Sequence, residues 1–220
     1  QMKKLITALA TLILLTSASY AFDRPTISLG GSTTAAYFEA AAHEVENSEK
    51  SQKETGAAIG GYVSAFGELT FADRLTIGIA YVPEDLETET VTRSRADKTT
   101  TATASTVTQT IKAQLEDMTT AYIAFNLTDN FYVKFGQVNM DLITKETLGT
   151  GAAYGNADLD GDVYGAGYQM TMDNGVFLRA EAMRVNIGGI SLTSTTNSAN
   201  KIVLDDIDGV NASLSIGKSF

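Results

Sequence analysis

Val210–Phe220, "VNASLSIGKSF", closes the chain and decides its fold class. Apolar residues stand at every second position from Val210 to Ile216, and the last residue is an aromatic, Phe220. Such alternation is typical of a strand with one apolar face. Because terminal residues are usually frayed and polar, this ending predicts a final strand that is held in a sheet.

The same period of two recurs through the chain and predicts seven further strands upstream of the last one. These predicted strands cover residues 26–40, 56–71, 74–82, 131–140, 162–172 and 175–185, and the fourth in chain order ends in residues 120–127. Most of the faces assigned as outward carry aliphatic or aromatic residues, and the opposite faces carry Ser, Gly, Thr and a few charges. The sequence therefore predicts an all-β protein.

Short and long connections alternate between these strands. Three connections are tight turns, "ADR" at 72–74, "TDN" at 128–130 and "DNG" at 173–175, built from residues that tolerate turn geometry. The others are long and polar, around 43–55, 83–106, 144–161 and 188–200. Transmembrane barrels have short turns at one end and long loops at the other. The pattern favours an eight-stranded antiparallel transmembrane barrel, with a secreted soluble barrel such as a lipocalin as the alternative.

Four charged residues stand inside the predicted strands, away from the strand ends: Glu68, Lys134, Arg179 and Glu181. A lipid-facing charge near the bilayer midplane costs about 2 to 4 kcal/mol. We therefore expect these four side chains to line the barrel interior and to pair there. Glycines at inward positions, such as Gly78 and Gly167, are expected to relieve crowding in a narrow lumen.

The first 21 residues have the features of an export signal. Lys3 and Lys4 precede an apolar run over residues 5–15, and Ser19 and Ala21 are spaced for cleavage after Ala21. The predicted barrel domain then covers residues 22–220. Without its two leader lysines, the chain keeps 14 basic and 26 acidic residues, a formal charge of −12. This acidity argues against nucleic acid as a partner.

The terminal "LSIGKSF", with the leader and the eight-strand pattern, resembles the small outer-membrane β-barrels of Gram-negative bacteria, of the OmpA transmembrane domain, OmpX and opacity-protein type. In that family a C-terminal aromatic preceded by alternating apolar residues is read by the barrel-assembly machinery. The resemblance implies this role for Leu214, Ile216 and Phe220, although Lys218 departs from the usual apolar residue. It also implies a location in the bacterial outer membrane, but no activity, because fold does not imply function.

His43 is the single histidine, and the predicted topology places it in the loop after the first strand. With Ser48 and either Glu44 or Glu46 it could form a catalytic group, since some barrels of this type are lipid A-modifying enzymes. A solvated loop histidine is the simpler interpretation. The sequence therefore predicts no enzyme, and no cofactor is expected.

"NADLDGD" holds oxygen ligands at alternating positions before a glycine, as in the first half of a calcium loop. The candidate ligands are Asn156, Asp158, Asp160 and Asp162. The position of the bidentate glutamate in such a loop falls on Gly167, which has no side chain. A calcium site and an ordinary acidic turn into a strand both stay open.

The third connection is rich in threonine and is predicted to continue the flanking strands as a hairpin above the membrane. Arg93, Arg95 and Lys98 near its tip form the main basic cluster of an acidic chain, suited to lipopolysaccharide phosphates. Its free edges could bind a partner strand, and a threonine-rich loop that binds nothing is the alternative.

These observations predict a non-enzymatic protein with a structural and surface-interaction role. The expected partners are outer-membrane lipid and lipopolysaccharide, the barrel-assembly machinery, and an extracellular protein or phage. A porin-like passive channel for small solutes is the main alternative, with the four interior charges setting its selectivity. An eight-stranded barrel is just filled by its own side chains, which disfavours a pore.

Overall fold

The computed structural model describes residues 25–46, 49–50, 54–87, 91–97, 105–147, 153–196 and 198–220, and the predicted leader at 1–21 lies outside them. The strands are β1 (Thr26–Glu46), β2 (Glu49–Lys50), β3 (Glu54–Phe71), β4 (Leu75–Tyr81), β5 (Leu86–Glu87), β6 (Val91–Asp97), β7 (Ser105–Asn126), β8 (Phe131–Thr147), β9 (Ala157–Thr171), β10 (Val176–Ile187), β11 (Ile190–Thr193), β12 (Lys201–Leu204) and β13 (Ile207–Ser219). No helix in this part of the chain is long and apolar enough to cross a bilayer.

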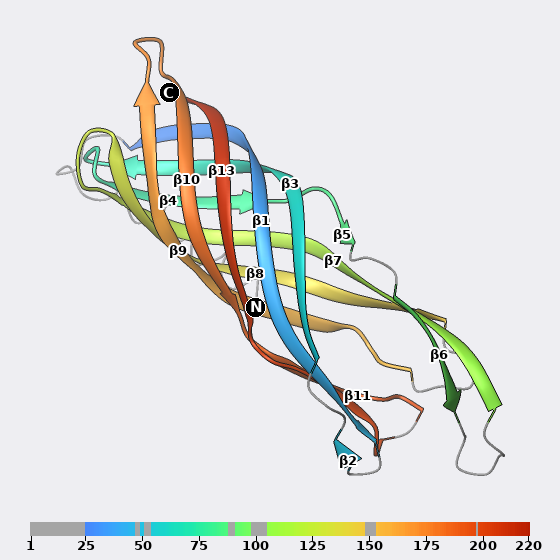
Figure 1. Cartoon of the computed structure of the whole chain (residues 1–220). Coiled ribbons are helices and arrows are strands. Elements are labelled where there is room, and N and C mark those ends of the chain that lie inside the picture. The colour runs from blue at the N-terminus through green and yellow to red at the C-terminus, as the bar shows by residue number, and fades with distance from the viewer. Residues whose placement is uncertain are drawn as a thin grey trace.

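Eight of these strands close into an antiparallel barrel (Figure 1). Around the wall the order is β1, β3, β4, β7, β8, β9, β10 and β13, and β13 then pairs with β1 over twelve residue pairs. The N–H of Phe220 donates a hydrogen bond to the carbonyl of Ile27 at 2.8 Å. The predicted fold class is therefore confirmed, and the final strand lies between β1 and β10, so it has no free edge.

Three tight turns join wall strands at one end of the barrel, as predicted. They lie at residues 72–74, 127–130 and 172–175. Ala72 and Asp73 have φ angles of 49° and 53°, and Gly175 has 81°, which is the left-handed region that tight turns use. We call this the turn end; β1 begins there and β13 finishes there. The opposite end is the loop end.

The strands extend further into the loop end than the sequence predicted. β1 runs to Glu46 instead of Ala40, β8 runs to Thr147, and β9 begins at Ala157. The predicted hairpin is present, because β6 pairs with the start of β7. The boundaries were wrong because the few apolar residues of these extensions, such as Leu142 and Leu159, stand among polar and charged residues that read as loop.

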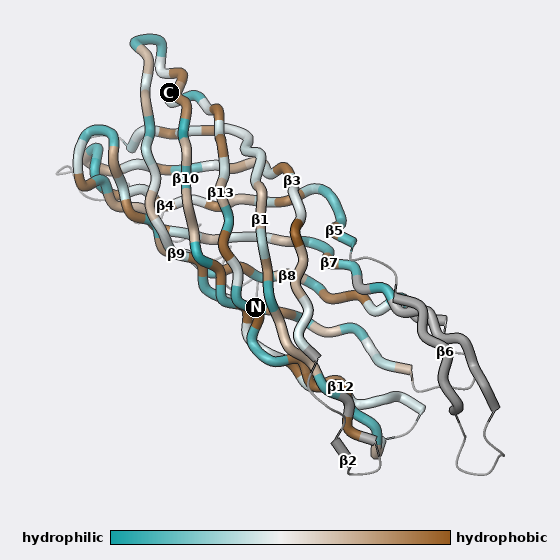
Figure 2. Tube along the Cα trace, viewed as in Figure 1, coloured by the Kyte–Doolittle hydropathy of each residue, from teal (hydrophilic) through white to brown (hydrophobic). Residues whose placement is uncertain are grey.

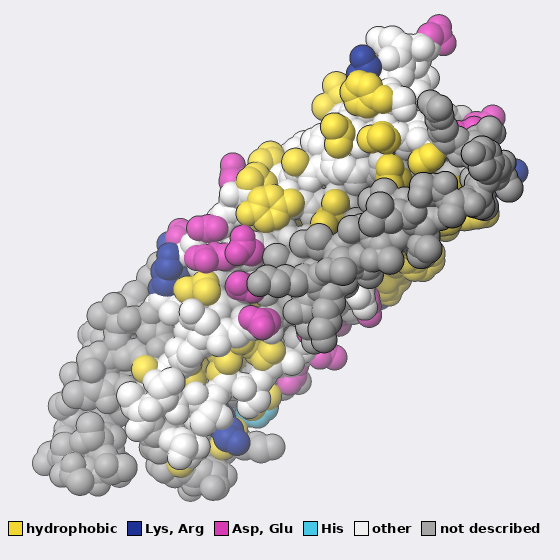
Figure 3. All heavy atoms as spheres, turned by 180° about the vertical axis from the view of Figure 1, so that it is seen from behind, with side chains coloured by type: hydrophobic (Ala, Val, Ile, Leu, Met, Phe, Trp, Pro, Cys, Tyr) yellow, Lys and Arg dark blue, Asp and Glu magenta, His cyan; other side chains and the backbone are white. Residues whose placement is uncertain are grey.

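Toward the turn end, the outer surface carries a broad band of apolar side chains. In Figure 2 apolar and polar residues alternate along strands such as β10 and β13, and in Figure 3 hydrophobic side chains gather over this half. The exposed residues of this set include Ile27, Leu29, Val63, Ile123, Phe125, Phe131, Phe135, Met170, Leu178, Leu214 and Ile216. A soluble protein rarely exposes so continuous an apolar surface, so this band suits lipid.

The polarity of the two faces reverses partway along the wall. In β8, Phe135 faces outward at the edge of the band, but beyond Gly136 the outward residues are polar, as with Gln137 and Asp141. Val138 and Met140 are buried inside at the same level. β9 and β10 change in the same way. The outer surface thus changes from apolar to polar where the interior changes from polar to apolar.

A group of ten apolar residues fills the interior beyond this reversal, and we call it the apolar plug. Its members are Val82, Met118, Val138, Met140, Leu142, Leu159, Val163, Met183, Val185 and Ile187. They come from β7, β8, β9 and β10 and from the residue after β4. The part of the barrel outside the apolar band therefore has an apolar core like that of a water-soluble β-barrel.

Candidate functional site: the ionic network of the barrel interior

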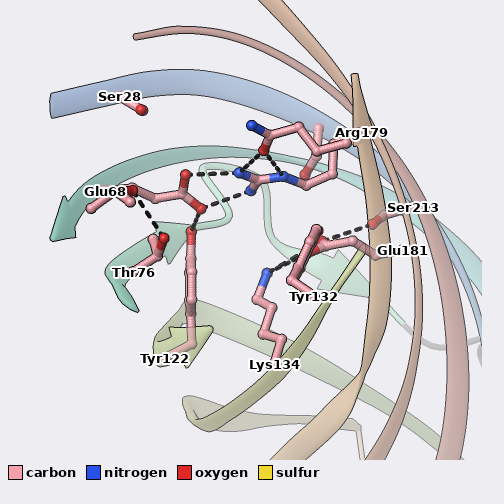
Figure 4. Close-up of polar contacts among 12 residues, drawn as sticks. Ser28, Glu68, Thr76, Tyr122, Tyr132, Lys134, Arg179, Glu181 and Ser213 are labelled. Atoms are coloured by element: carbon pink, nitrogen blue, oxygen red, sulfur yellow. Dashed lines mark hydrogen bonds and ion pairs between the residues drawn. The ribbon is translucent and has the colours of Figure 1, made fainter. Parts of the chain in front are cut away.

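An ion pair between Arg179 of β10 and Glu68 of β3 spans the interior on the turn side of the plug (Figure 4). The guanidinium Nη1 lies 2.7 Å from Oε1 of Glu68, and Nη2 lies 2.9 Å from Oε2. Arg179 is 9% exposed and Glu68 is 5% exposed. Two parallel hydrogen bonds between buried ions form the strongest and most directional kind of side-chain pair. Residues 111 positions apart in sequence thus link opposite parts of the wall.

A second ion pair joins Lys134 of β8 to Glu181 of β10. The Nζ of Lys134 lies 3.0 and 3.2 Å from the two carboxylate oxygens. The hydroxyl of Tyr132 donates to Oε1 of Glu181 at 2.5 Å, and that of Ser213 donates to Oε2 at 3.3 Å. Both carboxylate oxygens of Glu181 therefore accept hydrogen bonds from the wall.

Tyr122 of β7 connects the two pairs. Its hydroxyl donates to Oε1 of Glu68 at 2.7 Å, and the Nζ of Lys134 lies 3.9 Å from the centroid of its ring. On the other side, Gln169 of β9 accepts hydrogen bonds from Nε of Arg179 at 3.1 Å and from Nη2 at 2.7 Å. The ionic network, as we call these residues, includes side chains from β3, β7, β8, β9, β10 and β13.

Two glycines make room for the tyrosines of the network. A Cβ atom at Gly78 would collide with the ring of Tyr122, and one at Gly167 would collide with the ring of Tyr132. Both glycines lie on strands next to the tyrosine they face. The predicted role of these glycines as relief from crowding therefore has a specific physical cause.

The charges of the network are balanced and its polar atoms are paired. Two cations balance two carboxylates, and each of the four carboxylate oxygens accepts at least one hydrogen bond. Removing one member of a buried pair leaves an uncompensated charge, which costs about 3 to 5 kcal/mol. The ionic network therefore holds its side chains across the lumen, because separating them would leave a buried charge without its partner.

The network separates two interior spaces. A cavity of about 490 Å³ lies on its turn side, lined by residues such as Thr70, Thr76 and Asn126 and reaching the turn residues Asp73 and Asp129. A smaller space of about 90 Å³ lies beyond the network and extends among the residues of the apolar plug. Polar solutes thus have room from the turn end as far as the network.

The structure places all four predicted interior charges in this network. It places Leu214 and Ile216 on the outer face of β13, and Phe220 at the turn end with its ring 5.4 Å from the Nζ of Lys218. Leu214 and Ile216 lie in the apolar band. Their predicted role as an assembly signal stays a prediction.

His43 does not lie in a loop, contrary to the prediction. It lies within β1 and pairs with Val203 of β12. Ser48 and the side chains of Glu44 and Glu46 lie outside the described residues. The prediction was wrong because "AAHEVE" reads as polar loop, although the backbone continues the strand beyond the apolar band.

The predicted calcium residues do not form a loop either. Asp158, Asp160 and Asp162 lie in β9 and are all exposed on its outer face, and Asn156 accepts a hydrogen bond from the N–H of Thr144 at 3.1 Å. A straight strand spreads these oxygens along one line instead of around one point. Within the described ranges no group of three or more acidic or histidine side chains could hold a metal ion. Calcium binding by these residues stays a prediction, and the loop geometry that suggested it is not present.

Of the predicted basic cluster, Arg93 and Arg95 lie on β6, where they pair with Gln109 and Val107 of β7. Lys98 lies outside the described residues.

Sequence reasoning missed four polar partners of the charges and the whole plug. The missed partners are Tyr122, Tyr132, Gln169 and Ser213. A usable signal existed, because Tyr132 stands two residues from Lys134, and Gln169 lies directly across from Arg179 in the β9–β10 pair. Side chains two apart share a face.

A scan against protein-family models and a search of curated proteins both return no match. Among solved structures, the outer membrane protein OprG from Pseudomonas aeruginosa is similar with a TM-score of 0.51 and 11% identity, over 90% of this chain and 96% of that one. The outer membrane protein AlkL, solved in DMPC lipid bilayers, has a TM-score of 0.49 and 10% identity, over 92% of this chain and 93% of that one. The outer membrane protease OmpT from Escherichia coli has a TM-score of 0.44 and 8% identity, over 93% of this chain and 100% of that one. The chain therefore has the fold of the small bacterial outer-membrane β-barrels.

Proposed function

We propose that this protein is a non-enzymatic, non-conducting outer-membrane barrel with a structural and surface-interaction role. Its turn end faces the periplasm and its loop end faces the outside of the cell. The fold and the apolar band support the membrane location. The long paired strands of the loop end support a role in contacts at the cell surface.

The observation that carries this proposal is the double closure of the lumen. The ionic network crosses the interior at the level of Arg179 and Glu68, and the apolar plug above it leaves a space of only about 90 Å³. An ion that crossed would have to displace a bidentate buried ion pair and then pass between the apolar side chains of the plug. Both steps are costly, because isolated charges are strongly disfavoured in such surroundings.

The surface role rests on the loop end. The β6–β7 hairpin carries Arg93 and Arg95 on a chain with a formal charge of −10, which suits contact with lipopolysaccharide phosphates. An extracellular protein or phage is the further partner that we propose for this end. Phe220, with Leu214 and Ile216, is proposed as the segment read by the barrel-assembly machinery.

Conductance in planar bilayers tests the closed lumen. Purified protein should give no stable current steps, and Glu68→Gln and Lys134→Gln variants that keep the fold should change only stability. Reproducible steps in the unmodified protein whose ion selectivity changes in these variants would overturn the proposal.

Those same steps would establish the second candidate, a passive channel for small solutes. The cavity of about 490 Å³ on the turn side favours it, because a solute could enter that far without rearrangement. The enzyme alternative has a separate test: His43→Ala should leave the lipid A mass spectrum of the cells unchanged, and a shift in that spectrum would restore it.

A further inference from the structure

β3 has a free edge in the loop half of the barrel. Its pairing with β1 continues from Thr70 up to Glu54, but its pairing with β4 begins only at Ala65, which faces Tyr81. Among the described strands, none pairs with residues 55–64 on that side. Figure 1 shows β3 and β7 separating toward the loop end. Along a free edge, every second residue directs its N–H and C=O groups away from the sheet.

The exposure of this segment agrees with a free edge. Residues 55–61 are exposed on both faces of the strand, and Ile59 is 85% exposed. A Cβ atom added at Gly56 or at Gly60 would meet no atom within 4 Å. Most side chains here are small, as with Ala57 and Ala58, so another backbone could approach closely from the open side.

The break in the wall has local causes. β4 ends at Tyr81, and Pro83 follows, which lacks the N–H that a continued pairing would need. Opposite this point β7 carries a β-bulge between Glu116 and Thr119, with Asp117 at a φ of 53°. A bulge bends its strand and increases the local twist. β4 and β7 therefore bend away from β3 together, and among the described strands none pairs with this side of residues 55–64.

The edge of β3 differs from the edge of β6 in charge. β6 also pairs on one side only among the described strands, but it carries Arg93, Arg95 and Asp97. Charges and prolines are the usual means by which proteins protect free edges from unwanted pairing. Residues 55–64, "TGAAIGGYVS", contain neither. The unprotected edge is the one suited to accept a strand.

We propose that residues 55–64 of β3 form a docking edge for an extended, uncharged strand of a partner protein, added by β-augmentation. The strand would pair with β3 on the side that β4 leaves open. Backbone hydrogen bonds would supply the affinity, and the absence of edge charges would select an uncharged segment. This inference rests on the proposed surface-interaction role and gives that role a specific site.

A tethered peptide tests the proposal, because the chain has no cysteine and a single introduced thiol is unambiguous. A Gly56→Cys variant in detergent micelles is joined by a disulfide to a peptide of about eight alternating Thr and Val residues, a usual strand length. A short tether gives an effective concentration in the millimolar range, so a peptide of millimolar affinity should slow amide exchange about 2-fold or more. The slowing should affect every second amide between residues 57 and 64.

Two controls isolate backbone pairing. The same peptide with N-methyl groups at alternate residues keeps the side chains but lacks half of the donors, and it should give no slowing. The same tether on a Val210→Cys variant places the peptide on β13, which is paired on both sides, and it should also give none.

Other outcomes would overturn the proposal. These are no slowing with the unmodified peptide, or equal slowing with both peptides. In a further outcome, lipopolysaccharide protects the same amides, with no further change when the peptide is tethered. That result would identify a lipid as the occupant. A dimeric mass in detergent with the edge already protected would identify a second copy. None of these results depends on conductance, so failure here leaves the closed-lumen function to its own test.

Discussion

Toward the turns, the barrel interior holds two buried ion pairs with their tyrosine and amide partners, whereas toward the loops it holds aliphatic and methionine side chains. The two regions share the same strands: β10 contributes Arg179 and Glu181 to the network, and Met183, Val185 and Ile187 to the plug. What differs is the surroundings of the wall. Where lipid covers the outside, apolar residues face out, and where water covers it they face in. The place where the polarity reverses therefore marks the outer border of the apolar band.

The largest effect is expected from removing one partner of the bidentate pair. Arg179→Met should lower the free energy of unfolding by about 3 to 5 kcal/mol, because Glu68 is left charged and buried. Urea unfolding in lipid vesicles, followed by heat-modifiable migration on a gel, measures it. The double variant Arg179→Met/Glu68→Leu should recover most of the loss. A double variant as unstable as the single one would show that packing, not charge, dominates this site.

A somewhat smaller loss of unfolding free energy is expected from a truncation in the apolar plug. Leu159 is 2% exposed, and Leu159→Ala should cost about 3 kcal/mol through the lost transfer free energy and the cavity left behind. The same unfolding assay applies. Leu214→Ala, on the lipid-facing side, is the matched control and should cost less. Equal losses at both positions would mean that Leu159 does not lie in a packed core.

Removing the Tyr132 hydroxyl should have an intermediate effect within the network. Tyr132→Phe deletes a hydrogen bond to a charged carboxylate, which is worth about 1.5 to 3 kcal/mol. Glu181 keeps Lys134 and Ser213 as partners, so we expect the lower end of that range. Unfolding of Tyr132→Phe, compared with Tyr164→Phe on the outer face, checks this. A loss as large as that of Arg179→Met would contradict it.

The smallest effect is expected outside the membrane, at the exposed pair of Lys112 and Glu87. The hydrogen bond from Lys112 lowers the pKa of Glu87, with the charges of Lys112 and Lys145 acting in the same direction. Any stabilisation by this pair is present above the unfolded pKa of the carboxyl and is lost as the pH falls through its folded pKa. Because solvent screens the pair, Lys112→Gln should leave unfolding unchanged.

The same variant should raise the pKa of Glu87 toward its ordinary value. An NMR titration of the Glu87 side chain measures this change. A pKa that stays low in Lys112→Gln would mean that another group, such as Lys145, holds it.

The sequence predicted the network better than the plug. The charges at 68, 134, 179 and 181 could be assigned inward because lipid excludes them, and period two then fixed the face of their neighbours. The plug was missed because its residues have the opposite parity to the apolar band: Phe135 faces out, but Val138, three residues on, faces in. The facing itself alternates without a break, so apolar residues mark the outer face in one half of a strand and the inner face in the other half.

The strand boundaries at the loop end could not be predicted from the sequence either. Strand ends at Glu46 and Thr147 could not be located, because the few apolar residues near them stand among polar and charged residues that read as loop. The free edge of β3 was also beyond reach. It depends on where β4 stops pairing, and Pro83 indicates only a local break.

Side-specific labelling of introduced cysteines tests the closed lumen most directly. Thr70 lines the cavity on the turn side of the network, and Asn211 lines the smaller space beyond the network. In oriented proteoliposomes, a small hydrophilic thiol reagent added at the turn side should label Thr70→Cys and leave Asn211→Cys unmodified from either side. Labelling of Asn211→Cys from the turn side at a rate similar to that of Thr70→Cys would contradict closure by the ionic network.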